Sequence, residues 1–135
     1  MSKYFWEPVG KVPKFPDEAW VKKQIKNQLE RLSIWWFMPS SSAYGVSGIP
    51  DFVCCSVGMF ISIEAKDADG IWSEHQQERG IEIGKVKGVY ILVDEDGLDR
   101  LWHFLTQWVY SNELPQGIHD FRGLNKTKLI EERKK

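Results

Sequence analysis

The chain has little cysteine and little histidine, which limits the metal and redox chemistry it can carry. Its 135 residues include two cysteines, adjacent at Cys54 and Cys55, and three histidines scattered along the sequence. No further Cys or Cys-His pair lies at zinc-ligand spacing, so a disulfide framework and a structural zinc site are both excluded. Such cysteine usage is typical of a reducing compartment, and we expect a cytoplasmic protein.

Long apolar runs, repeats and low-complexity segments are missing too. No stretch has the length and apolarity of a membrane-spanning helix and no signal peptide is recognisable, so we expect no membrane partner. The formal net charge is −1, without the positive excess typical of nucleic-acid-binding domains. The lysines and arginines are grouped instead, in 22–26, 85–87 and 126–135. These groups serve either as solvated faces or as contacts for phosphates.

What the sequence does contain is the pattern of one α/β domain. At 135 residues the chain is long enough for one core and too short for two. We divide it into an irregular N-terminal arm over 1–16, a domain over 17–112 and a polar, basic C-terminal tail over 113–135. The order αβββαβα predicts a mixed β-sheet flanked by helices. Hydrophobic periodicity places the helices over 17–32, 73–87 and 98–111, and the strands over 34–38, 51–57, 59–66 and 88–94.

The most informative feature is the predicted hairpin between Asp51 and Lys66. If its turn centres on Val57 and Gly58, Asp51 lies opposite Glu64. Lys66 then points to the same face of the sheet, and two carboxylates and an amine converge. The alternative is three solvated charges on an exposed sheet face. Because directly opposed like charges destabilise a hairpin, this register needs a cation to offset them.

The chemistry of this group is that of a metal-dependent phosphodiesterase. Paired carboxylates suit Mg²⁺ or Mn²⁺, which keep several waters and are completed by phosphate oxygens of a substrate. Such an ion lowers the pKa of a bound water and stabilises charge on a phosphoryl oxygen. A nearby lysine, here Lys66, can orient or deprotonate that water.

The segments around this group resemble the PD-(D/E)xK nuclease superfamily. Residues 48–51 read Gly-Ile-Pro-Asp, and residues 60–66 read Phe-Ile-Ser-Ile-Glu-Ala-Lys. Residues 70–76 and 88–93 further resemble the VRR-NUC family, which is related to Holliday-junction resolvases. Two positions within 70–76 carry Trp and Glu where that family usually has Leu and Pro. The similarity extends from the first predicted helix to the last predicted strand.

The resemblance implies a single restriction-endonuclease-like nuclease domain that hydrolyses DNA and leaves a 5′-phosphate. Asp51 and Glu64 would ligate the metal together with the backbone carbonyl of Ala65, and Lys66 would act on the attacking water. Related nucleases also have an acidic residue at the place of Glu18, which would give the site a third carboxylate and a further metal ligand. The helix macrodipole alone also favours a carboxylate in this first helical turn.

Gln76 has two competing interpretations. Ser73 and Gln76 have the spacing of a helix capping box, in which the residue three positions after the cap bonds back to it. The resemblance instead assigns a glutamine at this place to the active site. Gly80 and Gly84 follow at four-residue steps on one helical face and would let the helix approach the sheet closely. The sequence leaves both interpretations of Gln76 open.

The chain is rich in tryptophan, with seven. Trp35 and Trp36 are neighbours on one predicted strand, so one faces outward unless both faces are covered, and a base-stacking surface or a subunit interface would use it. The helix over 98–111 has a broad apolar face. Because a four-way junction has two-fold symmetry that a pair of subunits would match, and because this face is wider than a small sheet needs, we expect a homodimer. Burial of the whole face inside the monomer is the competing explanation. The residues of this apolar face are Leu101, Trp102, Leu105, Trp108 and Val109.

We therefore predict a divalent-metal-dependent endonuclease that hydrolyses phosphodiester bonds of duplex or branched DNA and selects its substrate by structure. One alternative is a restriction-type nuclease with sequence specificity, for which the chain is short. The other is a nucleic-acid-binding module that keeps the fold without catalysis. Asp51, Glu64 and Lys66 favour an enzyme, because a non-catalytic module has no need for two opposed carboxylates.

Overall fold

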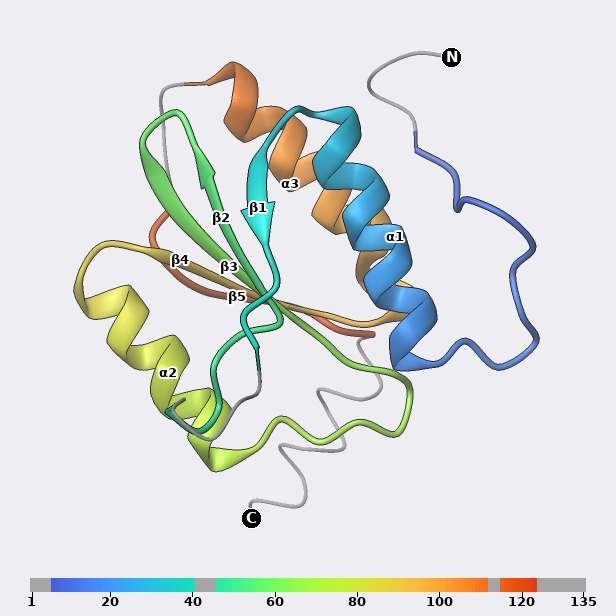
Figure 1. The fold of residues 1–135 in the computed structure, drawn as a ribbon, viewed down its shortest axis with the longest axis horizontal. Coiled ribbons are helices and arrows are strands. Elements are labelled where there is room, and N and C mark those ends of the chain that lie inside the picture. Colours follow the sequence, from blue (N-terminus) through green and yellow to red (C-terminus); the bar gives the residue numbers. More distant parts are fainter. Residues whose placement is uncertain (1–5, 41–45, 112–114, 124–135) are drawn as a thin grey trace.

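In the computed structural model, which describes residues 6–40, 46–111 and 115–123, a five-stranded sheet carries helices on both faces (Figure 1). The sheet order follows the chain, with the first three strands antiparallel and the last three parallel. The expected α/β domain with a mixed sheet is confirmed. Its elements are α1 (Glu18–Arg31), β1 (Trp35–Phe37), β2 (Phe52–Ser56), β3 (Met59–Ala65), α2 (Glu74–Lys85), β4 (Val89–Val93), the short 3₁₀ turn η1 (Glu95–Gly97), α3 (Leu98–Tyr110) and β5 (Gly117–Phe121).

The hydrophobic core lies between one face of the sheet and the helices α1 and α3. Asp17 caps α1 by accepting a hydrogen bond from the Trp20 N–H over 2.8 Å, so the helix begins where the sequence predicts. The apolar stripe of α1 meets the inward side chains of the hairpin and of α3. These core residues include Val21, Ile25, Leu29, Phe52, Cys54, Ile61, Ile63, Leu101, Trp102 and Leu105.

The hairpin of β2 and β3 has the predicted register. Phe52 pairs with Ile63, and the strands are joined by a two-residue turn at Val57 and Gly58. Both turn residues have positive φ, 46° for Val57 and 81° for Gly58. This backbone matches the right-handed twist of the strands, but it is unfavourable for the β-branched Val57. Continued by one residue, the register brings Asp51 opposite Glu64.

Helix α2 packs on the opposite face of the sheet, over β4 and β5. A Cβ added to Gly80 would lie 3.2 Å from the Tyr90 ring, and one added to Gly84 would lie 3.4 Å from the Gly117 Cα. The close approach expected from the glycine spacing is therefore confirmed. Trp35 and Phe37, on the same face of β1, stay exposed.

Strand β5 corrects the prediction that 113–135 is a polar tail. Gly117–Phe121 pairs parallel with β4, beginning with a 3.0 Å hydrogen bond from the Gly117 N–H to the Gly88 carbonyl. The segment has only two large apolar residues, so its own pattern is weak. It becomes a strand because the fully buried β4 offers it a free edge. The domain thus extends to residue 121 instead of 112, and the basic residues 126–135 lie outside the described part.

Three of the five residues on the apolar face of α3 are buried within the monomer. Leu101 and Leu105 are fully buried, and Trp102 packs in the same core with 2% of its surface exposed. These three side chains therefore need no second subunit to cover them, and they give no support to a homodimer. The side chains of 108–110 lie outside the described residues. The homodimer stays a prediction. No described helix, α3 included, is long and apolar enough to cross a membrane.

Candidate metal centre

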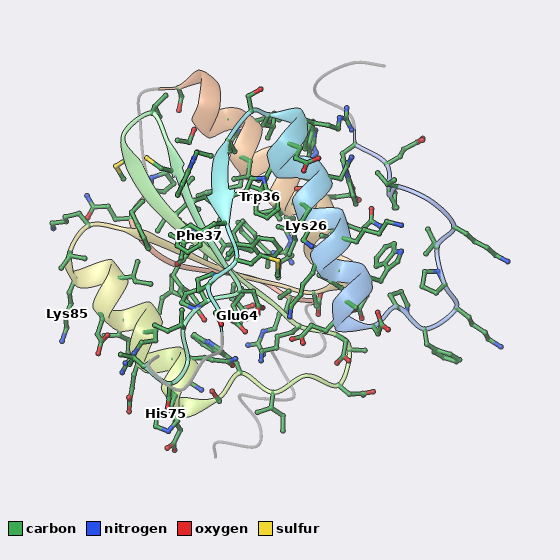
Figure 2. All side chains as sticks on the ribbon, viewed as in Figure 1. Lys26, Trp36, Phe37, Glu64, His75 and Lys85 are labelled. Carbon is green, nitrogen blue, oxygen red and sulfur yellow. The ribbon has the colours of Figure 1, made fainter. Side chains whose placement is uncertain are left out.

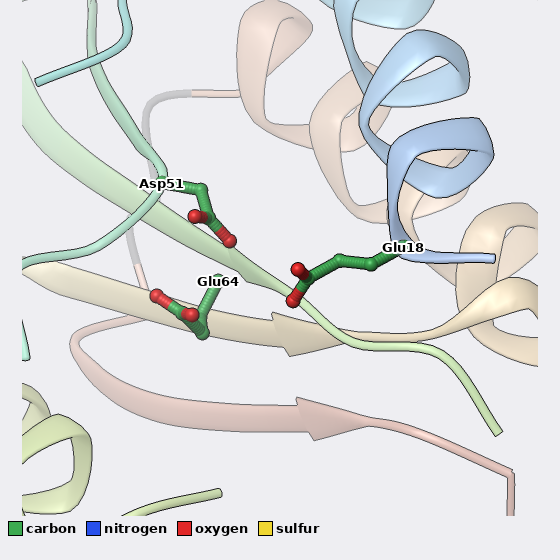
Figure 3. A group of neighbouring side chains, drawn as sticks. All are labelled: Glu18, Asp51 and Glu64. Atoms are coloured by element: carbon green, nitrogen blue, oxygen red, sulfur yellow. The ribbon is translucent and has the colours of Figure 1, made fainter. Parts of the chain in front are cut away.

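Three carboxylates from three separate segments of the chain converge beside the sheet (Figure 3). Glu18 begins α1, Asp51 immediately precedes β2, and Glu64 lies near the end of β3. Each offers one oxygen, and these three oxygens all lie within 4.8 Å of one another. The predicted convergence is confirmed, including the position of Glu18, which the sequence left open between site and helix macrodipole.

Asp51 is held by a backbone bond and an ammonium group. Its Oδ2 accepts a 2.9 Å hydrogen bond from the Ala65 N–H, which joins the two ends of the hairpin. Its Oδ1 lies 3.4 Å from Lys22 Nζ, and the same Nζ lies 3.8 Å from Glu18 Oε2. Lys22 therefore supplies a positive charge between two carboxylates of the cluster.

Glu64 is the buried member of the group. Only 2% of its surface is exposed, which excludes the alternative of solvated charges on an open sheet face. Its Oε1 accepts a 2.9 Å hydrogen bond from Gln76 Nε2, while its Oε2 is buried without a hydrogen-bond partner. Burial and then the negative charge of Asp51 raise the pKa of Glu64 to about 8, against the lowering effect of Lys66.

Lys66 completes the predicted triplet on the same face. Its Nζ lies 3.7 Å from Glu64 Oε1, and the residue is 8% exposed. Its N–H donates to the Val93 carbonyl over 2.9 Å, so the backbone continues the pairing of β3 with β4 by one residue. An amine and the buried carboxylate are thus within ion-pair distance, in a site largely removed from bulk water. The role of the Ala65 carbonyl as a ligand stays a prediction.

Gln76 satisfies both interpretations that the sequence left open. Its Oε1 accepts from the Ser73 N–H over 3.0 Å and its N–H donates to Ser73 Oγ over 3.2 Å, which is a complete capping box. Its Nε2 donates to Glu64 in the same arrangement. Because the cap uses the amide oxygen, it also fixes the direction of the amide nitrogen. The helix cap therefore aims the side chain at the metal centre.

The loop before Asp51 is fitted to the start of α2. Gly48 has a φ of 80°, and a Cβ at this position would lie 2.4 Å from the His75 carbonyl carbon and 2.7 Å from the Gln76 nitrogen. No side chain fits there without moving α2. This contact explains the glycine of the Gly-Ile-Pro-Asp segment, since the loop and the helix carry Asp51 and Gln76 to the same site.

An aromatic and cationic cluster lies beside the metal centre under α2. Trp72 stacks on Tyr90 with ring centroids 6.2 Å apart, and its Nε1 donates to the Tyr90 hydroxyl over 3.2 Å. Burial and then the charge of Glu64 raise the pKa of Tyr90 well above its usual value. Arg122 lies over the Trp72 ring and forms a two-point contact with Asp120. The Trp at position 72 thus packs between the Tyr90 ring of β4 and the Arg122 guanidinium that follows β5.

Sequence reasoning missed the role of Lys22, which it placed with Lys23 and Lys26 in a basic group. Its spacing of four residues from Glu18 could have indicated the contact, because such residues lie on one side of a helix. A second acidic group at 94–96 is consecutive in the chain and has a structural explanation. Asp94 accepts from the N–H of Asp96 over 2.9 Å and of Gly123 over 3.1 Å, so it holds the turn η1 against the end of β5.

The donor set fits a hard divalent cation such as Mg²⁺ or Mn²⁺. Three carboxylates supply oxygen ligands, and the buried, unpartnered Glu64 Oε2 is an acceptor that an ion would satisfy. Comparison with protein-family models, curated proteins and solved structures found no match for this chain.

Proposed function

We propose that this chain is a divalent-metal-dependent endonuclease that hydrolyses phosphodiester bonds in DNA. The observation that carries the proposal is the carboxylate group of Glu18, Asp51 and Glu64 with the Lys66 ammonium 3.7 Å from Glu64. The resemblance of residues 48–66 to the PD-(D/E)xK signature supports it. So does the convergence of the group on the buried Glu64, because a structural ion pair has no need of three converging carboxylates.

The residues divide into ligands and a proton-handling group. Glu18, Asp51 and Glu64 would hold the ion, with the Ala65 carbonyl as a further ligand. When bound, Mg²⁺ or Mn²⁺ would lower the pKa of a water and offset negative charge on the phosphate. Lys66 can orient the attacking water or exchange a proton with it. Gln76 holds the Glu64 carboxylate in place from the end of α2.

The test is a cleavage assay on single-stranded, duplex, flap and four-way-junction DNA, with RNA counterparts, in Mg²⁺ or Mn²⁺. Glu64 and Lys66 are buried, so their alanine variants would leave cavities, and isosteric variants are better probes. We expect Glu64→Gln and Lys66→Met to lower the cleavage rate by roughly a hundredfold or more while staying folded. Circular dichroism spectra check the fold.

Matched controls remove similar groups outside the metal centre. Glu74→Gln changes an exposed carboxylate at the start of α2, and Lys11→Met changes an exposed ammonium on the N-terminal arm. Both variants should cleave at the wild-type rate. Wild-type cleavage by Glu64→Gln or Lys66→Met would show that the carboxylate group is structural and would leave a nucleic-acid-binding module as the better interpretation.

Two finer parts of the proposal concern substrate and assembly. Selection of branched DNA and a homodimer both rest on the resemblance to junction-directed nucleases and on the two-fold symmetry of a four-way junction. Comparing the cleavage rates of flap and junction substrates distinguishes selection of branched DNA from a preference for ends or nicks. Sedimentation with and without junction DNA tests the second, since a species that stays at 15.7 kDa would exclude the dimer.

A further inference from the structure

Three exposed aromatic side chains lie on the sheet face that carries the metal centre. The exposed fractions are 62% for Trp35, 44% for Phe37 and 42% for Phe60. Trp35 and Phe37 contact each other edge to face, with ring centroids 5.5 Å apart. We call these three residues the aromatic strip. Trp36, between the first two, turns the other way and packs on Phe52 in the core.

The strand register connects the aromatic strip to the metal centre. Phe37 pairs with Val53, which is two residues from Asp51 on the same face of β2. Cys55 links the other two rings, because it pairs with Trp35 on one side and with Phe60 on the other. Side chains two residues apart on a strand are separated by about 7 Å. Phe37 therefore lies one row from the carboxylates, and Figure 2 shows it near Glu64. By the same register the two other rings lie about two rows away.

This half of the sheet face is left open by the helices. Helix α2 covers β4 and β5, whereas α1 and α3 pack on the opposite face. Val53 and Cys55, which lie between the rings, are uncharged. The strip is thus an exposed aromatic surface that begins one row from the carboxylates, on a part of the sheet face that α1, α2 and α3 leave open.

Positive charge lies at the far end of the strip. A Cβ added to Gly88 would lie 3.3 Å from the Phe60 ring, so the turn after α2 borders this ring. Lys85 is the last residue of α2 and Lys87 lies in this turn, and both are exposed. A strand of nucleic acid with one phosphate at the metal centre and another near these lysines would place its bases over the rings. Lys85 and Lys87 thus give this end of the strip the charge that complements a phosphate backbone.

We propose that the aromatic strip binds unpaired nucleobases next to the scissile phosphate. This rests on the proposed function and narrows its substrate to DNA with single-stranded nucleotides at the cleavage point. Bases in a duplex already cover each other's faces, so only unpaired bases can lie on protein rings. Stacking also tolerates any sequence, because every base has an aromatic face.

The experiment measures binding without divalent ions, so that it does not depend on cleavage. The probe is a fluorescein-labelled twelve-nucleotide oligothymidylate, compared by anisotropy with a twelve-base-pair duplex. For the double variant Trp35→Ala/Phe37→Ala we expect a loss of single-strand affinity on the order of tenfold or more, with duplex affinity unchanged. The salt dependence of binding should keep its slope, since no phosphate contact is removed. Trp35→Phe should retain most of the affinity.

Phe15→Ala is the matched control, because it removes an aromatic ring that is 82% exposed on the N-terminal arm. Equal single-strand binding by the wild type and the double variant overturns the inference, even if the wild type cleaves DNA. If binding depends on the strip but no substrate is cleaved with Mg²⁺ or Mn²⁺, the proposed hydrolysis fails and the binding surface stands. A dimer that the double variant dissociates, without a change in DNA binding, assigns the strip to a subunit interface and also overturns the inference.

Discussion

Gln76 donates from Nε2 to Glu64 Oε1 over 2.9 Å while its own Oε1 accepts from the Ser73 N–H over 3.0 Å. One side chain therefore joins the first turn of α2 to the buried carboxylate of β3. The local stability of the helix start and the orientation of Glu64 depend on the same amide. Substitutions that keep only one of the two contacts can separate the stability of the helix start from the orientation of Glu64.

Gln76→Glu keeps the cap acceptor but replaces the amide donor with a second carboxylate beside Glu64. Above the Glu64 pKa of about 8, where this carboxylate is ionised, we expect the metal-free protein to lose roughly 1–3 kcal/mol of unfolding free energy, because a buried acceptor loses its donor and gains a like charge. Urea unfolding in EDTA measures this. Ser73→Ala is the control, since it removes a cap acceptor at a cost of about 1 kcal/mol and should leave DNA cleavage unchanged. Equal stability of Gln76→Glu and wild type would show that the contact with Glu64 contributes nothing.

The stability of the metal-free protein should fall as pH rises. Glu64 has a pKa of about 8 in the folded protein and an ordinary value of 4.5, so between these values the folded state binds more protons than the unfolded state. Stability from this group is fully present below about pH 4.5 and is lost as pH rises through 8. Unfolding between pH 5 and 9 in EDTA should show this decline, and Glu64→Gln should flatten it. A profile unchanged by Glu64→Gln would contradict the raised pKa.

Lys22 should compete with a divalent ion for the carboxylates. Its ammonium lies within 3.8 Å of both Glu18 and Asp51, where a bound cation would repel it. We expect Lys22→Met to bind Mn²⁺ about fivefold more tightly, which corresponds to roughly 1 kcal/mol for like charges at this distance in a solvated site. Titration calorimetry measures the affinity, with Lys23→Met as the exposed control on the same helix. Weaker binding by Lys22→Met would show that the lysine organises the site instead.

Val57→Asn should stabilise the hairpin. Val57 is 68% exposed and has a φ of 46°, a conformation that Asn adopts more readily than a β-branched residue. With Gly58 it would form the Asn-Gly pair preferred in two-residue turns, and we expect a gain of about 1 kcal/mol. Thermal unfolding checks this. Gly58→Ala should have the opposite effect, because its φ is 81° while no atom within 4 Å would obstruct the added Cβ.

The sequence predicted the hairpin and the convergence of Asp51, Glu64 and Lys66 because the determinants are local. Alternating apolar residues and a central Gly58 specify the register, and the register alone places Asp51 opposite Glu64. Contacts between distant segments were harder to predict. Strand β5 depends on the exposed edge of β4 more than on its own residues, and the burial of Glu64 depends on where α2 packs. The pairing of Lys22 with Asp51 likewise requires the position of α1 relative to the hairpin.

For Trp35, the alternation of side chains along a strand predicts part of the outcome but not all of it. Its neighbour Trp36 made it certain that one ring faces outward if a single face is covered. Which ring does so follows from the position of α1 and α3, which pack on the side of Trp36 and Phe52. The outward ring then shares its face with Glu64, a relationship that only the complete sheet reveals.

The spatial order of the sheet, in which every strand lies beside the one made just before it, has a consequence for how the molecule is assembled during synthesis. A growing chain can add strands at one edge without inserting any of them between two that are already paired. Glu18, Asp51, Glu64, Lys66 and Gln76 have all been synthesised before β4 begins. We therefore expect nascent chains to hold all five of these side chains before the edge that receives β5 exists.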